Sequence, residues 1–414
     1  MAENNKRVDS LWRHSGFLLL WGGQSVSQIG SQVSLWAVPL VAVLLLKASP
    51  LEMGILALMG RLPLLLVGLV AGVWADRFPL RRVLIIADVG RALLIGSIPL
   101  AAWLNLLSIL QLYITMFLVG VLTVFFDVAY QSFLPSLVEG EQLVSANSKL
   151  ESTTAFASII GPGLAGTLVQ VISGPLAILI DALSFIVSSA SLAAIRVQES
   201  THKMRSGSHK LLAEMSEGVR FLWRQPIIRA LTISAALFNL FDNVLGAEYV
   251  LYLSRTLGLS ALYIGIVGAC GGIGWLLGAL FTEPLTRRFG LGTTLIGSIM
   301  ISCLAKACIA FAGGPFLLAL GPVIFGELVF QGVATVYSIN SLSLRQSVLP
   351  AEIRGRVTAV VRVVSWGVGS FGALFGGILA QWVGLRPTMI IAALGTLLAL
   401  VWIIFSPVRQ AQSL

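Results

Sequence analysis

The stretch "GVWADRFPLRR" (Gly72–Arg82) places one aspartate and three arginines on a short connection between two long apolar runs. Charged residues are otherwise scarce. They make up 11% of the chain, whereas soluble domains contain about 25%. Hydrophobic residues make up 57%, and the mean hydropathy is +0.93. Because a transmembrane helix needs about 20 mostly apolar residues, this composition indicates a polytopic membrane protein and excludes an ordinary soluble fold.

Apolar runs long enough to cross a membrane recur along the whole chain. We expect twelve transmembrane helices, close to residues 17–46, 51–74, 83–104, 109–130, 152–172, 175–195, 228–252, 260–281, 293–313, 316–340, 357–382 and 388–405. Their connections are short except for residues 196–226, which predict a polar cytoplasmic linker followed by an amphipathic helix. We therefore expect an all-α fold with one six-helix bundle at 1–195 and a second at 227–414.

The basic residues indicate which side of the membrane is cytoplasmic. With the N-terminus inside, 20 of the 27 Lys and Arg residues fall in cytoplasmic segments, and only Lys47, Arg255 and Arg386 face outside. This bias follows the positive-inside rule, so it explains the net charge of +9 without a nucleic-acid partner. We expect a multi-pass protein of the bacterial cytoplasmic membrane, in contact with its lipids and with both termini in the cytoplasm.

The two halves of the chain resemble each other. The fourth expected span ends in "QSFLP" (Gln131–Pro135), and 215 residues later the tenth ends in "QSVLP" (Gln346–Pro350). The second span is followed by "ADRFP" (Ala75–Pro79) and the eighth by "TRRFG" (Thr286–Gly290), at an offset of 211. Two parallel six-span repeats with a substrate site between them near the middle of the membrane are typical of secondary transporters.

The same motifs support a family resemblance. The stretch "GVWADRFPLRRVLI" resembles the loop signature of the major facilitator superfamily, and "GPGLAG" (Gly161–Gly166) resembles its antiporter motif. The stretches "LPSLVEGEQLVSANSKLESTTAFASIIGP" and "LPAEIRGRVTAV" are similar to the branch that contains macrolide-efflux pumps and the enterobactin exporter. The resemblance implies the twelve-helix fold of that superfamily, two pseudo-symmetric bundles, and alternating access. The fourth span lacks the arginine that many proton-coupled members carry, and Arg287 stands where the first half has Asp76.

The charged loop is expected to act as a conformational latch. Topology alone explains Arg77, Arg81 and Arg82, but acidic residues contribute little to the positive-inside bias. The resemblance places this loop against the start of the eleventh span, where a helix N-terminus attracts negative charge. Our hypothesis is that Asp76 accepts hydrogen bonds there and closes the cytoplasmic side. The expected latch residues are Gly72, Asp76, Arg77, Arg81, Arg82, Arg354 and Arg356.

Small residues predict where the two halves pack. The resemblance implies that the fifth and eighth spans meet at the interface, where Gly161, Pro162, Gly166, Gly268 and Gly272 allow close approach. Two interpretations remain open. The glycines form either a static packing contact or a seam along which the halves slide.

Ionisable side chains within spans are costly, about 2.5–3.5 kcal/mol each, so each is a functional candidate. We favour Glu327 and Asp242 as cavity acids that bind cationic groups or exchange protons; the alternative is structural ion pairing with Arg61 or Lys306. The resemblance places Lys306 at the lipid-facing periphery, where it snorkels or pairs with Glu327. Other charged residues are expected to be structural: Asp88, Arg91, Asp127 and Arg362 as a charge network, and Asp181 and Glu248 as hydrated groups near the outer surface.

Polar and aromatic residues suggest a lining for the cavity. Gln24, Gln28 and Gln32 recur every four residues in the first span, which predicts a stripe facing water or substrate. The alternative is hydrogen bonding to a neighbouring helix. The other candidate cavity residues are Trp36, Arg61, Phe238, Asn239, Asp242, Glu327, Gln331 and Trp366.

These observations predict a transporter that exports amphipathic small molecules, cationic ones among them, by proton-coupled antiport as a monomer. The alternative substrate is a siderophore or a lipid-like metabolite. Cys270, Cys303 and Cys308 all lie in apolar runs and form no CxxC pair, so no metal site, cofactor or disulfide is expected. A channel or a membrane-embedded enzyme is disfavoured, because the sequence has no filter loop, HExxH motif or Walker loop.

Overall fold

The computed structural model describes residues 11, 14–75, 78–138, 140–196 and 208–410. These residues form helices and turns and contain no strand. Twelve helices within them are long and apolar enough to span a membrane. The all-α, twelve-helix prediction is therefore confirmed.

The helices follow the apolar runs closely. Their bounds are α1 Ser15–Leu44, α2 Pro50–Ala75, α3 Leu80–Trp103, α4 Ile109–Leu137, α5 Glu141–Val171, α6 Gly174–Ala194, α7 Ser208–Arg224, α8 Pro226–Leu251, α9 Ala261–Phe289, α10 Leu291–Phe311, α11 Phe316–Val348, α12 Ala351–Val383 and α13 Leu385–Ile404. A π-helical turn, Tyr252–Thr256, extends α8, and a 3₁₀ turn, Pro407–Gln410, follows α13.

Several helices extend beyond the expected spans. Helix α5 begins at Glu141 rather than near 152, and α11 continues to Val348 rather than ending near 340. The reason is that hydropathy detects only the apolar part of a helix, whereas the polar turns at its end also satisfy their backbone hydrogen bonds by remaining helical.

Local sequence signals set the helix ends. Ser49 and Glu52 form a reciprocal cap at the start of α2, in which the Ser49 backbone N–H donates to Glu52 Oε2 at 2.6 Å. Single glycines join α9 to α10 and α12 to α13. Gly290 and Gly384 have φ values of 79° and 93°, a backbone conformation that side chains with a Cβ disfavour.

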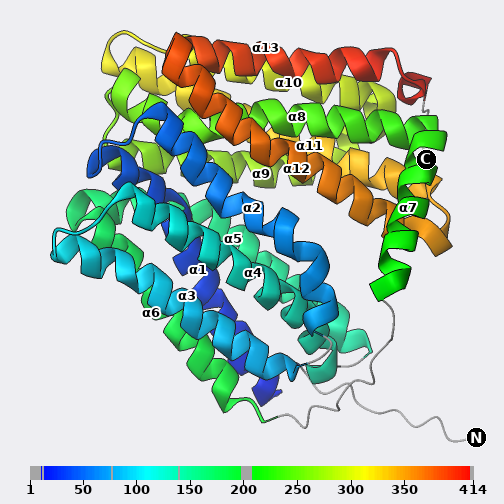
Figure 1. Cartoon of the computed structure of the whole chain (residues 1–414). Coiled ribbons are helices and arrows are strands. Elements are labelled where there is room, and N and C mark those ends of the chain that lie inside the picture. The colour runs from blue at the N-terminus through cyan, green and yellow to red at the C-terminus, as the bar shows by residue number, and fades with distance from the viewer. Residues whose placement is uncertain (1–10, 12–13, 76–77, 139, 197–207, 411–414) are drawn as a thin grey trace, which may run out of the picture.

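The membrane helices form two bundles (Figure 1). Helices α1–α6 pack mainly against one another, α8–α13 do the same, and the main contacts between bundles are α5 with α9 and α2 with α12. Helix α7 lies on α12, where Leu222 joins an apolar cluster with Val357 and Val361. The chain enters α1 and leaves α13 on the side that carries α7. We call this side the terminal face and the opposite side the distal face.

Among the described residues, an apolar core joins the two bundles only in their distal halves. One cluster spans both bundles in their distal halves, with Val41 and Ala165 from the first bundle and Val244 and Ile264 from the second. In the terminal halves each bundle has a core of its own. One surrounds Phe133 and the other Leu231. The molecule is therefore closed toward the distal face and divided toward the terminal face, as Figure 1 also shows.

Candidate functional site

Small residues bring the bundles into backbone contact at two places. A Cβ on Gly265 would lie 2.6 Å from the Pro162 carbonyl oxygen, and one on Gly54 would lie 2.9 Å from Gly377 Cα. Pro162, Gly166, Gly268 and Gly272 all lie at the α5–α9 crossing, as expected. Gly161 does not, because it packs against Gln32 of α1 within its own bundle.

The second bundle contains a buried ion pair. The ammonium group of Lys306 on α10 lies 3.2 Å from Asp242 Oδ1 on α8, and its side chain is fully buried. The Phe238 and Phe330 ring centroids lie 5.0 and 4.6 Å from this ammonium group, close enough for cation–π attraction. The ion-pair alternative is confirmed for Asp242. The expectation that Lys306 snorkels is wrong, because its side chain is buried inside the bundle. Its ion pair is with Asp242, and Glu327 is close enough to interact with its charge.

Asp242 also connects the two bundles electrostatically. Its side chain is 37% exposed, and Arg61 of α2, in the other bundle, is close enough to interact with its charge. Arg61 is itself exposed. Counted along their helices at 1.5 Å per residue, both side chains lie about 14–17 Å from the distal helix ends. Since a charged group at that depth avoids hydrocarbon, these exposed surfaces face the space between the bundles.

Glu327 occupies a more enclosed position. It is 5% exposed and accepts a 2.9 Å hydrogen bond from Gln331 Nε2, one turn farther along α11. A Cβ on Gly271 of α9 would lie 2.9 Å from Glu327 Oε1, so a larger residue there would require the carboxyl group to shift. The buried Tyr249 hydroxyl lies close to it. Glu327 and Gln331 are therefore brought together as expected, while their role in transport stays a prediction.

The remaining candidates of the second bundle divide into buried and exposed groups. Phe238 is 7% exposed and stacks on Phe330 and Tyr337 inside the bundle. Asn239 bonds to its own helix, through Nδ2 to the Ala235 carbonyl. Trp366 of α12 is 48% exposed, and the Arg362 guanidinium stacks on it at 4.8 Å. Of these three candidates, only Trp366 presents a large surface for a ligand.

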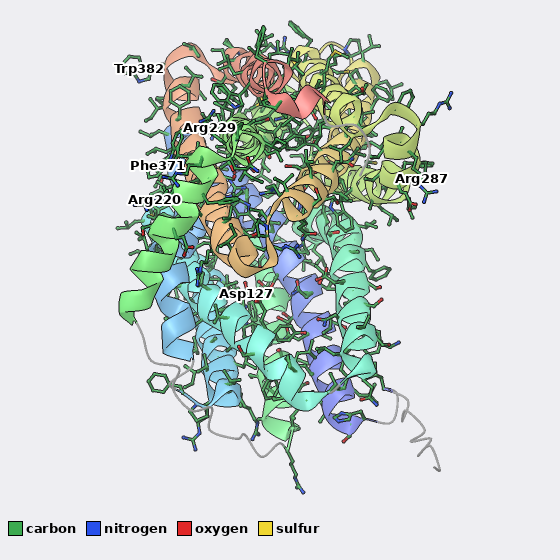
Figure 2. All side chains as sticks on the ribbon, turned by 90° about the vertical axis from the view of Figure 1, so that its right-hand side faces the viewer. Asp127, Arg220, Arg229, Arg287, Phe371 and Trp382 are labelled. Carbon is green, nitrogen blue, oxygen red and sulfur yellow. The ribbon has the colours of Figure 1, made fainter. Side chains whose placement is uncertain are left out.

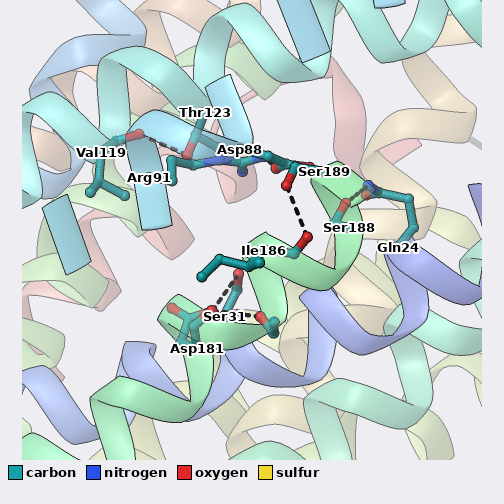
Figure 3. A network of polar contacts seen from close by, with 11 residues as sticks. Gln24, Ser31, Asp88, Arg91, Val119, Thr123, Asp181, Ile186, Ser188 and Ser189 are labelled. Atoms are coloured by element: carbon teal, nitrogen blue, oxygen red, sulfur yellow. Dashed lines mark hydrogen bonds and ion pairs between the residues drawn. The ribbon is translucent and has the colours of Figure 1, made fainter. Parts of the chain in front are cut away.

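The glutamine stripe of α1 does not face one common surface. Gln24 Nε2 donates a 3.0 Å hydrogen bond to Ser188 Oγ of α6 (Figure 3), as the alternative interpretation predicts. Gln24 and Gln28 also line a cavity in the first bundle, whereas Gln32 packs on Gly161. Trp36 contacts the other bundle, since a Cβ on Gly268 of α9 would lie 2.7 Å from Trp36 Cζ2.

Buried charges hold α3 and α6 of the first bundle together. Asp88 and Arg91 of α3 form an ion pair (Figure 3). The Arg91 guanidinium lies between the Phe126 and Phe185 rings, 4.2 and 4.4 Å from their centroids. Asp181 of α6 accepts hydrogen bonds from Ser31 and Ser184 and is 2% exposed. The expectation of a hydrated Asp181 is wrong.

Glu248 also differs from the expectation of a hydrated residue. Its side chain on α8 is fully buried, and neither carboxyl oxygen has a hydrogen-bond partner among the described residues. A helical position near the outer surface indicated exposure, but the helices packed around α8 cover it.

Sequence reasoning missed a polar cavity in the first bundle. It has a volume of about 320 Å³ and lies between the terminal halves of α1, α4 and α5. Two carboxylates line it, Asp127 of α4 and Glu151 of α5, together with the Phe126 and Tyr130 rings. Figure 2 shows Asp127 near the centre of the molecule when the terminal face is viewed. The signal in the sequence was weak, because the two acids are 24 residues apart and on different helices.

The described latch residues bind to different elements. Arg81 donates to the Leu192 carbonyl at 2.8 Å and to the Ala193 carbonyl, at the end of α6. Arg356 pairs with Glu217 of α7 at 2.6 Å, and Arg354 donates to the Leu349 carbonyl. Arg82 is exposed, and Gly72 lies in the last turns of α2. Asp76 and Arg77 lie outside the described residues, so the latch stays a prediction.

Comparisons with known proteins agree with this architecture. A sequence profile of the Major Facilitator Superfamily matches residues 20–370 and also 231–413. The multidrug efflux pump Tap of Mycolicibacterium fortuitum is 28% identical over 91% of this chain and 92% of its own. Macrolide efflux protein A of Streptococcus pyogenes is 24% identical over 96% and 97%. A point mutant of the nucleoside transporter NupG has a TM-score of 0.80 at 12% identity, covering 94% of this chain and 99% of its own.

Proposed function

The chain belongs to the Major Facilitator Superfamily, and from that premise we propose that it exports amphipathic small molecules by proton-coupled alternating access. The observation that carries the proposal is the distribution of the apolar cores. They join the bundles in the distal halves and remain separate in the terminal halves. A protein held together at one end of its interface can open alternately at either end if the bundles rock as rigid bodies.

The charge distribution supports an inward-open state of a protein in the bacterial cytoplasmic membrane. Among the described residues, helix ends at the terminal face carry Arg81, Arg82, Arg224, Arg287, Arg288 and Arg354, whereas Lys47, Arg255 and Arg386 lie at the distal face. By the positive-inside rule the terminal face is cytoplasmic. Both termini are then cytoplasmic, and the space between the separated terminal halves opens toward the cytoplasm. Each chain has both bundles, so we propose that the monomer is functional.

The side chains between the bundles support a drug-like substrate. Trp366 offers an aromatic surface, and Asp242 and Arg61 offer opposite charges on the two sides of the space. Glu327 offers an enclosed carboxyl group. The two relatives named above are described as multidrug and macrolide efflux proteins, which supports the same substrate class here.

Transport in proteoliposomes tests the proposal. We expect erythromycin, chloramphenicol and ethidium to move faster when a pH gradient is imposed. We expect Glu327→Gln to abolish the effect of the gradient, because the amide cannot exchange a proton, and Asp242→Asn to reduce it. Glu283→Gln is the control, since Glu283 is an exposed acid paired with Arg287 at 2.7 Å. Transport of none of the three compounds would contradict export, and equal transport without a gradient would contradict proton coupling.

A further inference from the structure

The cavity of the first bundle has the composition of a cation site. Of its 15 lining residues, Asp127 and Glu151 are acidic and none is Lys or Arg. Amide and hydroxyl groups make up much of the remainder, with Gln24, Gln28, Gln131 and Asn147 among them. The wall therefore carries two formal negative charges with hydrogen-bonding groups around them.

The two acids lie at the same distance from the terminal helix ends. Asp127 lies ten residues before the end of α4, and Glu151 lies ten residues after the start of α5. Both are therefore about 15 Å from the terminal helix ends. Both are exposed. Both side chains line the cavity, so their exposed carboxyl groups face it.

Several polar groups of the cavity are uncommitted. Among the described residues, Gln28, Gln131, Asp127 and Glu151 make no side-chain hydrogen bond. Two other lining groups are already bonded: Asn147 Nδ2 donates to the Leu143 carbonyl, and Thr153 Oγ1 accepts a hydrogen bond from Trp21 Nε1. The four uncommitted groups line one cavity, where a ligand with N–H or O–H donors can use them.

Aromatic rings complete the wall. The rings of Phe126 and Tyr130 stack with centroids 5.9 Å apart, and both line the cavity. The Tyr130 hydroxyl lies close to both Asp127 and Glu151. An aromatic surface beside an anionic group attracts flat organic cations through both charge and the ring quadrupole.

Two arginines lie near Asp127 but outside the cavity wall. Arg91 is already paired with Asp88 and enclosed by two rings. Arg362 belongs to α12 in the other bundle, where it stacks on Trp366. Both are close enough to Asp127 to interact with it electrostatically, but neither lines the cavity.

We propose that this cavity binds the positively charged part of an organic cation, with Asp127 and Glu151 as its counter-ions and Phe126 and Tyr130 as its aromatic wall. The inference rests on the proposed export function and assigns it a substrate class. Ligand sites typically begin at about 300 Å³, so the cavity holds a small aromatic cation or the charged part of a larger one. Asp242 and Glu327, which the sequence favoured as acids that bind cationic groups or exchange protons, then remain available for proton exchange.

Binding to the purified full-length protein tests the inference, with ethidium as the aromatic cation and chloramphenicol as the neutral probe. We expect Asp127→Asn and Glu151→Gln each to weaken ethidium binding roughly 10- to 100-fold, because each removes one charge-assisted contact. Asp127→Glu retains the charge and should stay within about threefold of the original protein. Chloramphenicol binding should not change in any variant, which also shows that the variants are folded.

The other outcomes distinguish failure of the cation site from failure of the proposed export function. Glu283→Gln removes an exposed acid on α9 and must leave ethidium binding unchanged. If Asp127→Asn and Glu151→Gln bind ethidium as tightly as the original protein, or if the original protein binds chloramphenicol but not ethidium, the cation site is refuted while export stands. If the protein neither binds nor transports any of the probes, the proposed export function fails as well.

Discussion

At the scale of single residues, we expect removal of Asp242 and removal of Lys306 to lower stability by different amounts. Lys306 is fully buried, whereas Asp242 is 37% exposed. Asp242→Asn leaves a buried ammonium group without its partner, a change that costs about 3–5 kcal/mol. Lys306→Met leaves an acid that water can reach and should cost less. We therefore expect thermal unfolding in detergent to show a larger loss for Asp242→Asn, and the double variant should be no less stable than Lys306→Met. Equal losses for the two single variants would contradict this account.

The same residues show what the sequence could reveal at this scale. The pairing of Asp242 with a basic residue was open to prediction, because an acid within an apolar span needs a partner. The direction of the Lys306 side chain could not be predicted. It depends on the rotation of α10 about its axis, and the apolar run is nearly uniform around the helix. Glu248 was misjudged for the same reason, because helical spacing defines a face but not the neighbour that covers it.

At the scale of helices, glycines at the α5–α9 crossing should control the conformational equilibrium. A Cβ on Gly272 would lie 2.7 Å from Ile159 Cα in the other bundle. Gly272→Val therefore disfavours the closed distal halves, and we expect it to favour the state in which they separate. Gly161→Val disturbs only the packing of α5 on α1, so it should lower thermal stability with little effect on that equilibrium.

Spin labels on the distal face can measure this difference. Asn105 on the first bundle and Arg255 on the second are both exposed, so cysteines there can be labelled after Cys270, Cys303 and Cys308 are replaced. We expect the distance distribution between the labels to gain a longer component in Gly272→Val but not in Gly161→Val. The same distribution in both variants would favour static packing over a moving seam.

At the scale of the whole molecule, the sequence predicted the architecture but not its state. Twelve apolar runs determine the number of helices, because each helix satisfies its backbone polar groups within itself, and the repeated motifs indicate two halves. The pairing of helices across the halves came from the family resemblance. The state depends instead on which halves of the bundles share a core, and that is a small energy difference between two packings. The cavity near Asp127 and Glu151 was out of reach for a similar reason. It exists only where α1, α4 and α5 meet, and no spacing within one helix indicates it.

The proposed latch is expected to control how far the terminal halves of the whole molecule close. If Asp76 docks on the N-terminus of α12 when the terminal halves close, the interaction contributes about 1–2 kcal/mol, which changes the ratio of the two states roughly five- to thirtyfold. Asp76→Asn should therefore lower the ratio of the closed to the open state by that factor and slow turnover. Labels at the exposed Val144 of α5 and Phe289 of α9 report closure at the terminal face. Glu283→Gln, an acid change on α9 at the same face, is the matched control. An unchanged distance between the labels in Asp76→Asn would show that the loop arginines serve topology alone and that another contact closes the terminal halves.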